Sequence, residues 1–284
     1  MRSLALAALL GAGFLHPLQA ETAKPRPYTV ETIKDVVYYD GDDQHKVKHK
    51  LDLYLPKGLK GFPVLFFVHG GAWVHGDKDT FGLYGLFAAA YAKQGIGVVV
   101  TNYRLSPAVQ HPEHIRDVAR AFAWCCKNIE RHGGRADQLF LCGHSAGAHL
   151  VSLLASDLTY LTAHKLTTSA IRGVIPISGP LVLPPGFMPR VFGSARDASV
   201  NASPIKHVHE KMPPFLILYA DKDLPGCDRK PSEKFCKAVR DKGNEAEVVE
   251  ITGSDHIRIM VSAGAAKDRV YETIVEFIRK HATR

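Results

Sequence analysis

Residues 138–154, QLFLCGHSAGAHLVSLL, hold a single small nucleophilic residue between two apolar stretches. Residues 139–142 have the length and apolarity of a fully buried parallel strand, and residues 146–154 have the composition and spacing of a helix that enters the core. Ser145 therefore lies on the turn that joins a strand to a helix.

Two glycines flank this serine in the pattern G-x-S-x-G, because Gly143 and Gly147 stand two residues to either side of Ser145. So sharp a turn brings strand and helix together so closely that side chains at the flanking positions would collide. The hydroxyl is then held at the carboxyl edge of a sheet, where a helix N-terminus favours developing negative charge. A short pattern of small residues also arises by chance, but the strand before it and the helix after it favour a nucleophile.

The rest of the chain alternates between strand and helix patterns. Strands are expected at residues 27–40, 45–56, 62–71, 96–105, 171–179, 213–221 and 245–252, and helices at 81–95, 111–134, 230–243 and 266–281. This order predicts an α/β fold with a mostly parallel central sheet, helices on both faces and an antiparallel hairpin in front. Active sites in such sheets lie at the carboxyl ends of the strands.

Composition indicates a single globular domain over residues 21–284. The chain has 284 residues, of which 46% are hydrophobic and 23% charged, with a formal net charge of +8. One α/β domain accounts for this length. Basic residues are interspersed with acidic ones, which is typical of a solvated surface and not of a nucleic-acid site. Composition leaves both a monomer and a homodimer open.

The first twenty residues differ in kind from the rest. Residues 1–20 combine a short basic start, an apolar run and a small residue, Ala20, before Glu21. This pattern predicts a secretory signal peptide that is cleaved near Ala20, and hence a periplasmic or secreted protein. The apolar run is too short to span a bilayer comfortably, so no stable membrane insertion is expected. A retained anchor is the alternative, because Leu18 is unusual three residues before a cleavage point.

Five cysteines make disulfides feasible in an exported chain. Cys227 and Cys236 fall in a loop and in the helix that follows it, and we expect them to pair. Cys142 belongs to the buried strand and is expected to be an inert thiol. Cys125 and Cys126 point to different sides of one helix, so they are not expected to pair with each other.

A nucleophilic serine needs a base, an acid that orients the base, and donors for an oxyanion. The stretch HGGAW at 69–73 ends a strand with small residues whose backbone N–H groups could approach a substrate oxygen. Asp221 and Asp223 follow the penultimate strand in YADKD, and His256 follows the last strand in GSDH. The sequence therefore supplies each part at the end of a strand.

Together, HGGAW, NYRLSP, GHSAGAHL, YADKD and SDH, in this order, resemble the α/β-hydrolase superfamily. The resemblance covers about residues 40–280 and is greatest to carboxylesterases of the hormone-sensitive-lipase and arylformamidase (BD-FAE-like) kind. It implies Ser145 as nucleophile, His256 as base and Asp223 as the partner of the base. The implied oxyanion hole consists of the backbone N–H groups of Gly71, Ala72 and Ala146.

The resemblance implies a serine carboxylesterase that hydrolyses short-chain acyl or aryl esters through an acyl-enzyme, with a small-molecule ester as its partner and without metal or cofactor. Alternatives are amide hydrolysis of the arylformamidase type and a non-catalytic binding member of the fold. Asp221 is the alternative acid. Two positions depart from the commonest lipase pattern: Ala72 stands in place of glycine, and His144 stands where many relatives have an acid.

Several other polar residues are expected to have structural roles. We expect His69 to hold the oxyanion loop through hydrogen bonds, and Arg104 to form a structural ion pair with Asp117. Four further histidines lack the spacing that places two imidazoles on one helix face, so no metal site is expected from them. These are His111, His114, His207 and His209.

The stretch 180–212 is rich in proline, glycine and serine, and the resemblance places a cap or lid insertion there. Because it is short, we expect an open pocket that suits small acyl groups. Four apolar residues in it either line the pocket or anchor the loop. They are Phe187, Met188, Val191 and Phe192.

Overall fold

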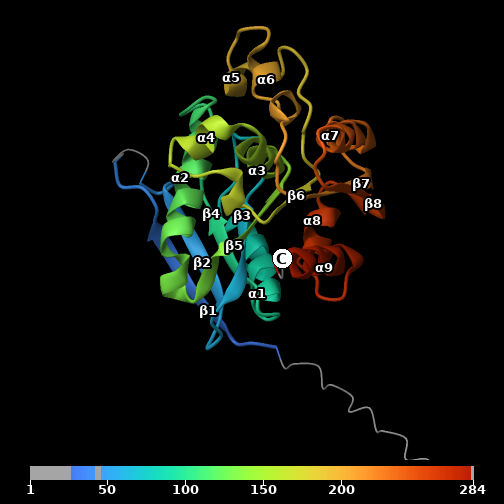
Figure 1. Cartoon of the computed structure of the whole chain (residues 1–284). Coiled ribbons are helices and arrows are strands. Elements are labelled where there is room, and N and C mark those ends of the chain that lie inside the picture. The colour runs from blue at the N-terminus through green and yellow to red at the C-terminus, as the bar shows by residue number, and fades with distance from the viewer. Residues whose placement is uncertain (1–26, 42–45, 283–284) are drawn as a thin grey trace, which may run out of the picture.

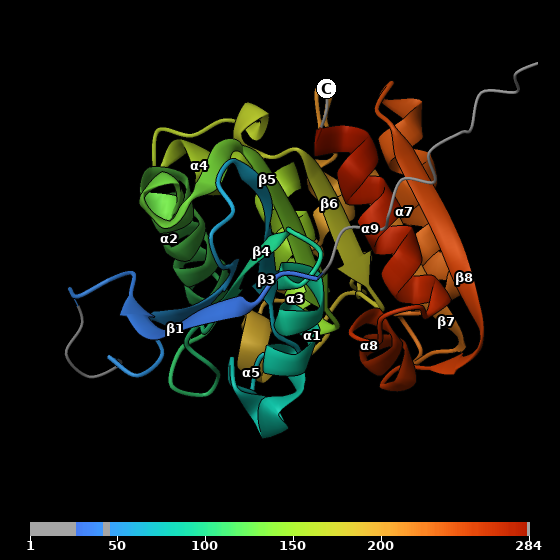
Figure 2. The ribbon, with the colours of Figure 1, turned by 90° about the horizontal axis from the view of Figure 1, so that it is seen from below.

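The computed structural model describes residues 27–41 and 46–282. The expected signal peptide at residues 1–20 lies outside the described residues. The described chain forms an eight-stranded sheet with helices on both faces (Figures 1 and 2). The predicted α/β class and the mostly parallel sheet are therefore confirmed.

The strands lie in the order β1-β2-β4-β3-β5-β6-β7-β8. β1 pairs with β2, and β2 with β4, in antiparallel fashion, and all other neighbours are parallel. The bounds are β1 Val30–Val37, β2 Lys50–Pro56, β3 Phe62–Val68, β4 Gly97–Thr101, β5 Gly134–His144, β6 Gly173–Ile177, β7 Phe215–Lys222 and β8 Ala246–Asp255. The expected hairpin at the start of the domain is β1 and β2.

The helices form one layer on each face of this sheet. The α-helices are α1 Leu83–Ala92, α2 Glu113–Asn128, α3 Ala146–Ser156, α4 Leu158–Thr162, α5 Pro189–Phe192, α6 Ala198–Asn201, α7 Arg229–Asp241, α8 Arg258–Ala263 and α9 Arg269–Ala282. The 3-10 turns are η2 Thr80–Gly82, η3 Ile129–His132, η4 Thr168–Ala170 and η5 Pro204–His207. Buried side chains of α2, α3 and α7 share one core, and those of α1, α8 and α9 share the other.

Strand β3 shows how the two cores fix the site. Its side chains alternate between the cores, as the pleat of a strand requires. Phe66 meets Phe122 of α2 with ring centroids 5.5 Å apart, and Phe67 meets Phe87 of α1 at 4.6 Å. Complete burial of each phenylalanine contributes about 1.5–3 kcal/mol. The end of β3, where HGGAW begins, is thus held from both faces.

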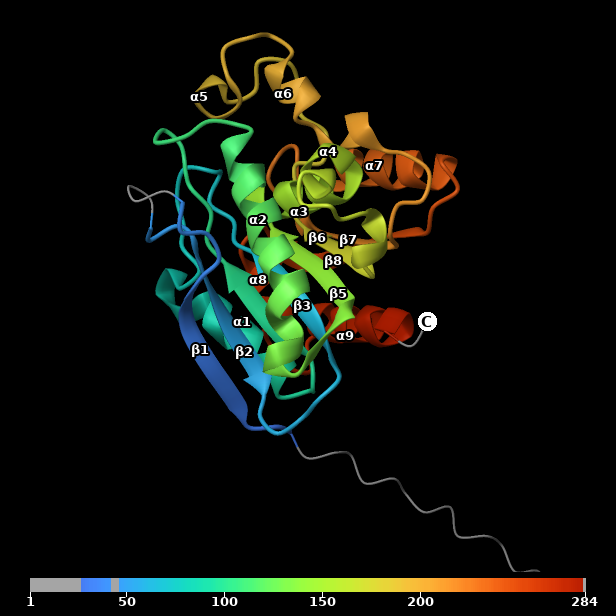
Figure 3. The ribbon, with the colours of Figure 1, turned by 60° about the vertical axis from the view of Figure 1, so that its left-hand side comes forward.

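The segment 180–212 contains α5, α6 and η5, which form a small group at one end of the molecule, beyond α3 and α4 (Figures 1 and 3). His149 of α3 is tied to this segment, because its Nε2–H donates to the carbonyl oxygen of Ala202 at 2.8 Å. Within the described part of the chain, no helix combines the length and apolarity that crossing a membrane requires.

Candidate active site

The turn between β5 and α3 has the strained backbone that its glycines predict. Ser145 has φ 55° and ψ −120°, a conformation that costs on the order of 1–3 kcal/mol. A Cβ on Gly143 would lie 2.4 Å from the carbonyl oxygen of Gly147, and a Cβ on Gly147 would lie 2.0 Å from that of Val68. The Ser145 N–H donates to Ile177 of β6 at 2.9 Å. Glycine at both positions 143 and 147 therefore allows the turn that places Ser145 at the carboxyl edge of the sheet.

Ser145, His256 and Asp223 form one chain of hydrogen bonds. The Nε2 of His256 lies 3.0 Å from the Oγ of Ser145, and its Nδ1 lies 2.6 Å from Oδ1 of Asp223. A carboxylate only accepts, so the ring proton is on Nδ1 and Nε2 is free to accept a proton from the serine. The structure therefore brings together three residues from the ends of β5, β7 and β8.

The carboxylate of Asp223 is held by more than the histidine. Its Oδ2 accepts from the hydroxyl of Ser178 at 2.5 Å and from the N–H of Ala220 at 3.0 Å. Burial acts to raise the pKa of Asp223, but the bonds from His256, Ser178 and Ala220 outweigh it and hold the pKa below its ordinary value. Asp223 is therefore ionised at neutral pH and can stabilise a protonated imidazole.

Asp221 binds backbone N–H groups and not the imidazole of His256. Its two oxygens accept the backbone N–H groups of Gly253 and Ser254, each at 2.9 Å. These residues lead directly to His256, so Asp221 ties the end of β7 to the loop that carries the histidine. Of the two carboxylates that the sequence left open, only Asp223 contacts the imidazole.

The HGGAW loop turns sharply beside the serine. Gly71, Ala72 and Trp73 all have positive φ, of 116°, 53° and 60°. A Cβ on Gly70 would come within 3.2 Å of the Cβ of Ser145, so the loop backbone packs against the nucleophile. Within residues 27–41 and 46–282, the N–H groups of Gly71 and Ala72 have no acceptor.

The N–H of Ala146, the first residue of α3, belongs to the set that a helix N-terminus leaves without an intrahelical partner. It adjoins Ser145 directly. That Gly71, Ala72 and Ala146 together form the oxyanion hole stays a prediction.

His69 supports this loop as expected. Its ring stacks on Tyr103 with centroids 4.5 Å apart, and its Nδ1–H donates to the carbonyl oxygen of Gly70 at 2.7 Å. Burial lowers the pKa of His69 to about 4, so the ring is neutral at pH 7. His69 fixes the loop and does not contact Ser145.

Aromatic rings fill the space between the loop and the 180–212 segment. Trp73 meets His149 and Phe192 edge to face, with centroids 5.1 Å and 5.0 Å apart. Val191 and Phe192 are buried, which makes them anchors of the segment, whereas Phe187 and Met188 are half-buried. Whether Phe187 and Met188 line the pocket stays a prediction.

A mainly apolar cavity of about 670 Å³ lies between the 180–212 segment and the start of α7. Pro184, Val200 and Ile205 line it on one side, and Gly226 and Pro231 on the other. None of the three residues of the hydrogen-bond chain belongs to its lining.

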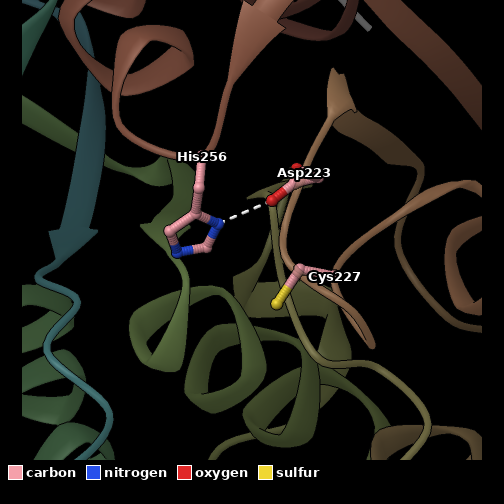
Figure 4. Close-up of side chains that lie close together, drawn as sticks. All are labelled: Asp223, Cys227 and His256. Atoms are coloured by element: carbon pink, nitrogen blue, oxygen red, sulfur yellow. Dashed lines mark hydrogen bonds and ion pairs between the residues drawn. The ribbon is translucent and has the colours of Figure 1, made fainter.

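The ion pair between Arg104 and Asp117 is confirmed as a buried structural contact. Asp117 accepts from Nε of Arg104 at 2.7 Å and from Arg120 at 2.7 Å. His111, His114, His207 and His209 take no part in the cluster of candidate metal ligands that the described residues contain. That cluster is Asp223, Cys227 and His256, drawn in Figure 4.

The expected disulfide is wrong. Cys227 and Cys236 are both free and buried. Cys236 lies on the face of α7 that packs into the core, whereas Cys227 lies in the loop after β7 beside Asp223 and His256. The thiol of Cys236 therefore lies in the core, whereas the thiol of Cys227 lies beside Asp223 and His256.

Sequence reasoning missed one contributor to the site, Ser178, and one neighbour of it, Cys227. Ser178, just after β6, donates to Asp223 and has φ 50°, and nothing in the stretch ISG distinguished it from an ordinary turn residue. Cys227 was considered only as half of a disulfide. Ser178 lies far along the chain from Asp223, and Cys227 from His256, so only the folded arrangement reveals that they are close.

Comparison with known proteins finds esterases and a formamidase that are similar to this chain. The BD-FAE family model matches residues 51–181. Esterase LipQ of Mycobacterium tuberculosis is 30% identical over 276 residues, covering 89% of this chain and 63% of LipQ. Kynurenine formamidase of Danio rerio is 28% identical over 250 residues, covering 86% of this chain and 80% of that protein.

Among solved structures, a truncated carbohydrate esterase from gut microbiota superposes with a TM-score of 0.75 at 19% identity, covering 92% of this chain and 99% of that one. The chain spans between 53% and 66% of the length of three curated esterase relatives. These likenesses support an α/β-hydrolase carboxylesterase of the BD-FAE and hormone-sensitive-lipase kind, and the solved structures share its fold.

Proposed function

We propose that the protein is a serine carboxylesterase that hydrolyses short-chain acyl or aryl esters. The observation that carries this proposal is the continuous hydrogen-bond chain from Asp223 through His256 to Ser145, with distances of 2.6 Å and 3.0 Å. The family resemblance to esterases supports the reaction class.

In this mechanism the Oγ of Ser145 attacks the ester carbonyl carbon while Nε2 of His256 accepts its proton. Asp223 keeps the Nδ1 proton in place and stabilises the imidazolium that forms. The oxyanion accepts hydrogen bonds from the backbone N–H groups of Gly71, Ala72 and Ala146. The proton then passes to the leaving alcohol, and water attacks the acyl-enzyme by the same route, which releases the acid and restores Ser145.

The first test compares Ser145→Ala with Ser152→Ala on p-nitrophenyl acetate. Both serines lie at α3, but the hydroxyl of Ser152 is buried and has no partner among the described residues, so its loss should leave kcat nearly unchanged. Loss of the nucleophile should lower kcat by about 10⁴–10⁶. Negligible, equal rates in the wild type and Ser145→Ala would favour the non-catalytic binding alternative.

The same assay tests the base. His256→Gln removes the imidazole that accepts the serine proton, so we expect kcat to fall by about 10⁴–10⁶, as in Ser145→Ala. A nearly unchanged kcat in His256→Gln would contradict this role.

The preference for short acyl groups rests on the ring cluster of Trp73, His149 and Phe192, which occupies space between the HGGAW loop and the 180–212 segment. A panel of p-nitrophenyl esters from acetate to decanoate should give its highest kcat/KM at the short end. Phe192→Ala should move the preference toward longer chains, and an unchanged profile in this variant would place the acyl group elsewhere.

Hydrolysis of aryl formamides is the second candidate, and the similarity to kynurenine formamidase supports it. The same three side chains would serve, because amide and ester hydrolysis share the tetrahedral intermediate. A matched pair of substrates, N-formyl aniline and phenyl formate, separates amide hydrolysis from ester hydrolysis. A higher kcat/KM for N-formyl aniline would favour formamidase activity.

We also propose export of the protein, on the basis of residues 1–20. Expression of the full chain in a bacterial host with N-terminal sequencing of the exported product tests this. A product that begins at Glu21 would support cleavage after Ala20, whereas an intact N-terminus on a membrane-bound product would favour a retained anchor.

A further inference from the structure

A free thiol lies beside the proposed acid and base. One ligand atom from each of Asp223, Cys227 and His256 can be chosen so that the three lie within 4.8 Å of one another. Figure 4 shows the sulfur of Cys227 and the imidazole of His256 projecting into the same space beside the carboxylate of Asp223. The proposed mechanism makes no use of this thiol.

The three atoms are a sulfur, an imidazole nitrogen and a carboxylate oxygen, which is a donor set that suits Zn²⁺ and similar soft or borderline cations. In a tetrahedral zinc site such ligand atoms lie about 3.5 Å apart. Because no two of the three chosen atoms are more than 4.8 Å apart, shifts of about 1 Å would bring them to this spacing.

The charges also fit a buried divalent cation. A thiolate and a carboxylate carry two negative charges and a neutral imidazole carries none, so a bound Zn²⁺ would leave the site neutral, as burial favours. Cys227 and His256 are both buried. Burial raises the pKa of the Cys227 thiol to about 12, with Asp223 and Asp228 adding to the rise, so the ion must displace a proton from sulfur when it binds.

A metal here is incompatible with the proposed catalysis, whichever ring nitrogen it takes. An ion on Nε2 would occupy the lone pair that must accept the proton of Ser145. An ion on Nδ1 would replace the 2.6 Å hydrogen bond to Asp223 and leave the ring proton on Nε2, which then cannot act as a base. Either arrangement stops the reaction.

We propose that Asp223, Cys227 and His256 form a binding site for Zn²⁺ or a similar thiophilic cation, and that occupancy of this site reversibly inhibits the enzyme. The inhibition rests on the proposed function, but the binding does not. Mg²⁺ and Ca²⁺, which prefer oxygen ligands, should not compete.

The experiment titrates ZnCl₂ into the full-length protein in a non-chelating buffer and follows p-nitrophenyl acetate hydrolysis, with EDTA added at the end. Cys227→Ser and Cys227→Ala should keep the metal-free rate and raise the inhibitory Zn²⁺ concentration by at least about tenfold, because a metal–sulfur bond is lost. Cys236→Ser, which removes another buried thiol, is the matched control and should be inhibited like the wild type. Equal inhibition of the wild type and both Cys227 variants would overturn the proposal.

Binding is measured separately in the Ser145→Ala background, where activity is not needed. CdCl₂ should produce an ultraviolet sulfur-to-metal charge-transfer band in Ser145→Ala that is absent when Cys227→Ala is added. If the band persists without Cys227, or never forms, the site is refuted even where the esterase activity holds. If the band forms but the wild type shows no esterase activity, the proposed function fails and the metal site stands.

Discussion

Nε2 of His144 lies 2.8 Å from the backbone carbonyl oxygen of His256. A carbonyl oxygen only accepts, so His144 donates from Nε2–H, and burial lowers its pKa to about 4, which keeps the ring neutral. His144, which immediately precedes Ser145, thus holds the backbone of His256, whose imidazole contacts the Ser145 hydroxyl. β5 and β8 are separated by β6 and β7 in the sheet, so this bond couples two distant edges of the site.

His144→Phe tests this coupling. The ring volume is largely kept, but the carbonyl of His256 loses its donor and the imidazole is no longer held in line with Ser145. A displacement of about 1 Å at a reacting group can cost about 10²-fold in rate, so we expect kcat to fall by that order with KM little changed. His132→Phe, in η3 at the opposite end of β5 from Ser145, is the control. An unaltered kcat in His144→Phe would show that the loop is positioned without this bond.

Replacing Asp223 and replacing Asp221 should have very different effects on kcat. Asp223→Asn should lower kcat by about 10⁴, since an amide cannot stabilise the imidazolium and favours the wrong tautomer. Asp221→Asn should lower it far less, because it weakens only the bonds to Gly253 and Ser254. Steady-state kinetics on p-nitrophenyl acetate measure both losses. A larger loss of kcat in Asp221→Asn than in Asp223→Asn would make Asp221 the acid.

The turn at Ser145 could be predicted from the sequence because its cause is local. The apolar run before it, the helix after it and the two glycines are all contained in one short stretch. The sequence alone could not decide which aspartate pairs with His256, because Asp221 and Asp223 lie two residues apart at the end of the same strand. Which of them reaches the imidazole depends on how the loop after β7 folds against the loop after β8.

The disulfide prediction failed for a related reason. Spacing along the chain placed Cys227 and Cys236 near each other, but α7 rotates Cys236 into the core, among residues such as Phe235 and Val239. Helix α8 was also missed, and β5 begins at Gly134, ahead of the apolar residues that signalled it. These elements are short or polar, so tertiary packing and not local pattern sets them.

The HGGAW loop should tolerate no side chain at its second glycine. Gly71 has φ 116°, and a Cβ there would lie 2.1 Å from the carbonyl oxygen of His75. Gly71→Ala must shift the backbone donors, so we expect kcat to fall by about 10²–10³. Gly82→Ala is the matched control, because Gly82 also has positive φ but has nothing within 4 Å of the added carbon. Similar losses in both variants would mean that backbone strain, and not donor placement, is responsible.

The buried ion pair of Asp117 should make stability depend on acid pH. Burial acts to raise the pKa of Asp117, but the nearby His49 ring and hydrogen bonds from Arg104 outweigh it and lower the pKa to about 2. An unfolded aspartate titrates near 3.9, so the folded state binds the proton less well and the stabilisation is present above about pH 4. It is lost as the pH falls toward 2.

Asp117→Asn should therefore destabilise the protein most at neutral pH, by about 3–5 kcal/mol, because Arg104 keeps a mostly buried charge without its main partner. Urea unfolding at pH 7 and near pH 2.5 should show the difference from wild type shrinking as the wild-type carboxylate begins to protonate. Asp137→Asn, at the exposed pair with Arg135, should change the free energy of unfolding by about 0–1 kcal/mol. An Asp117→Asn difference that is equal at both pH values would mean that the loss comes from packing and not from the charge.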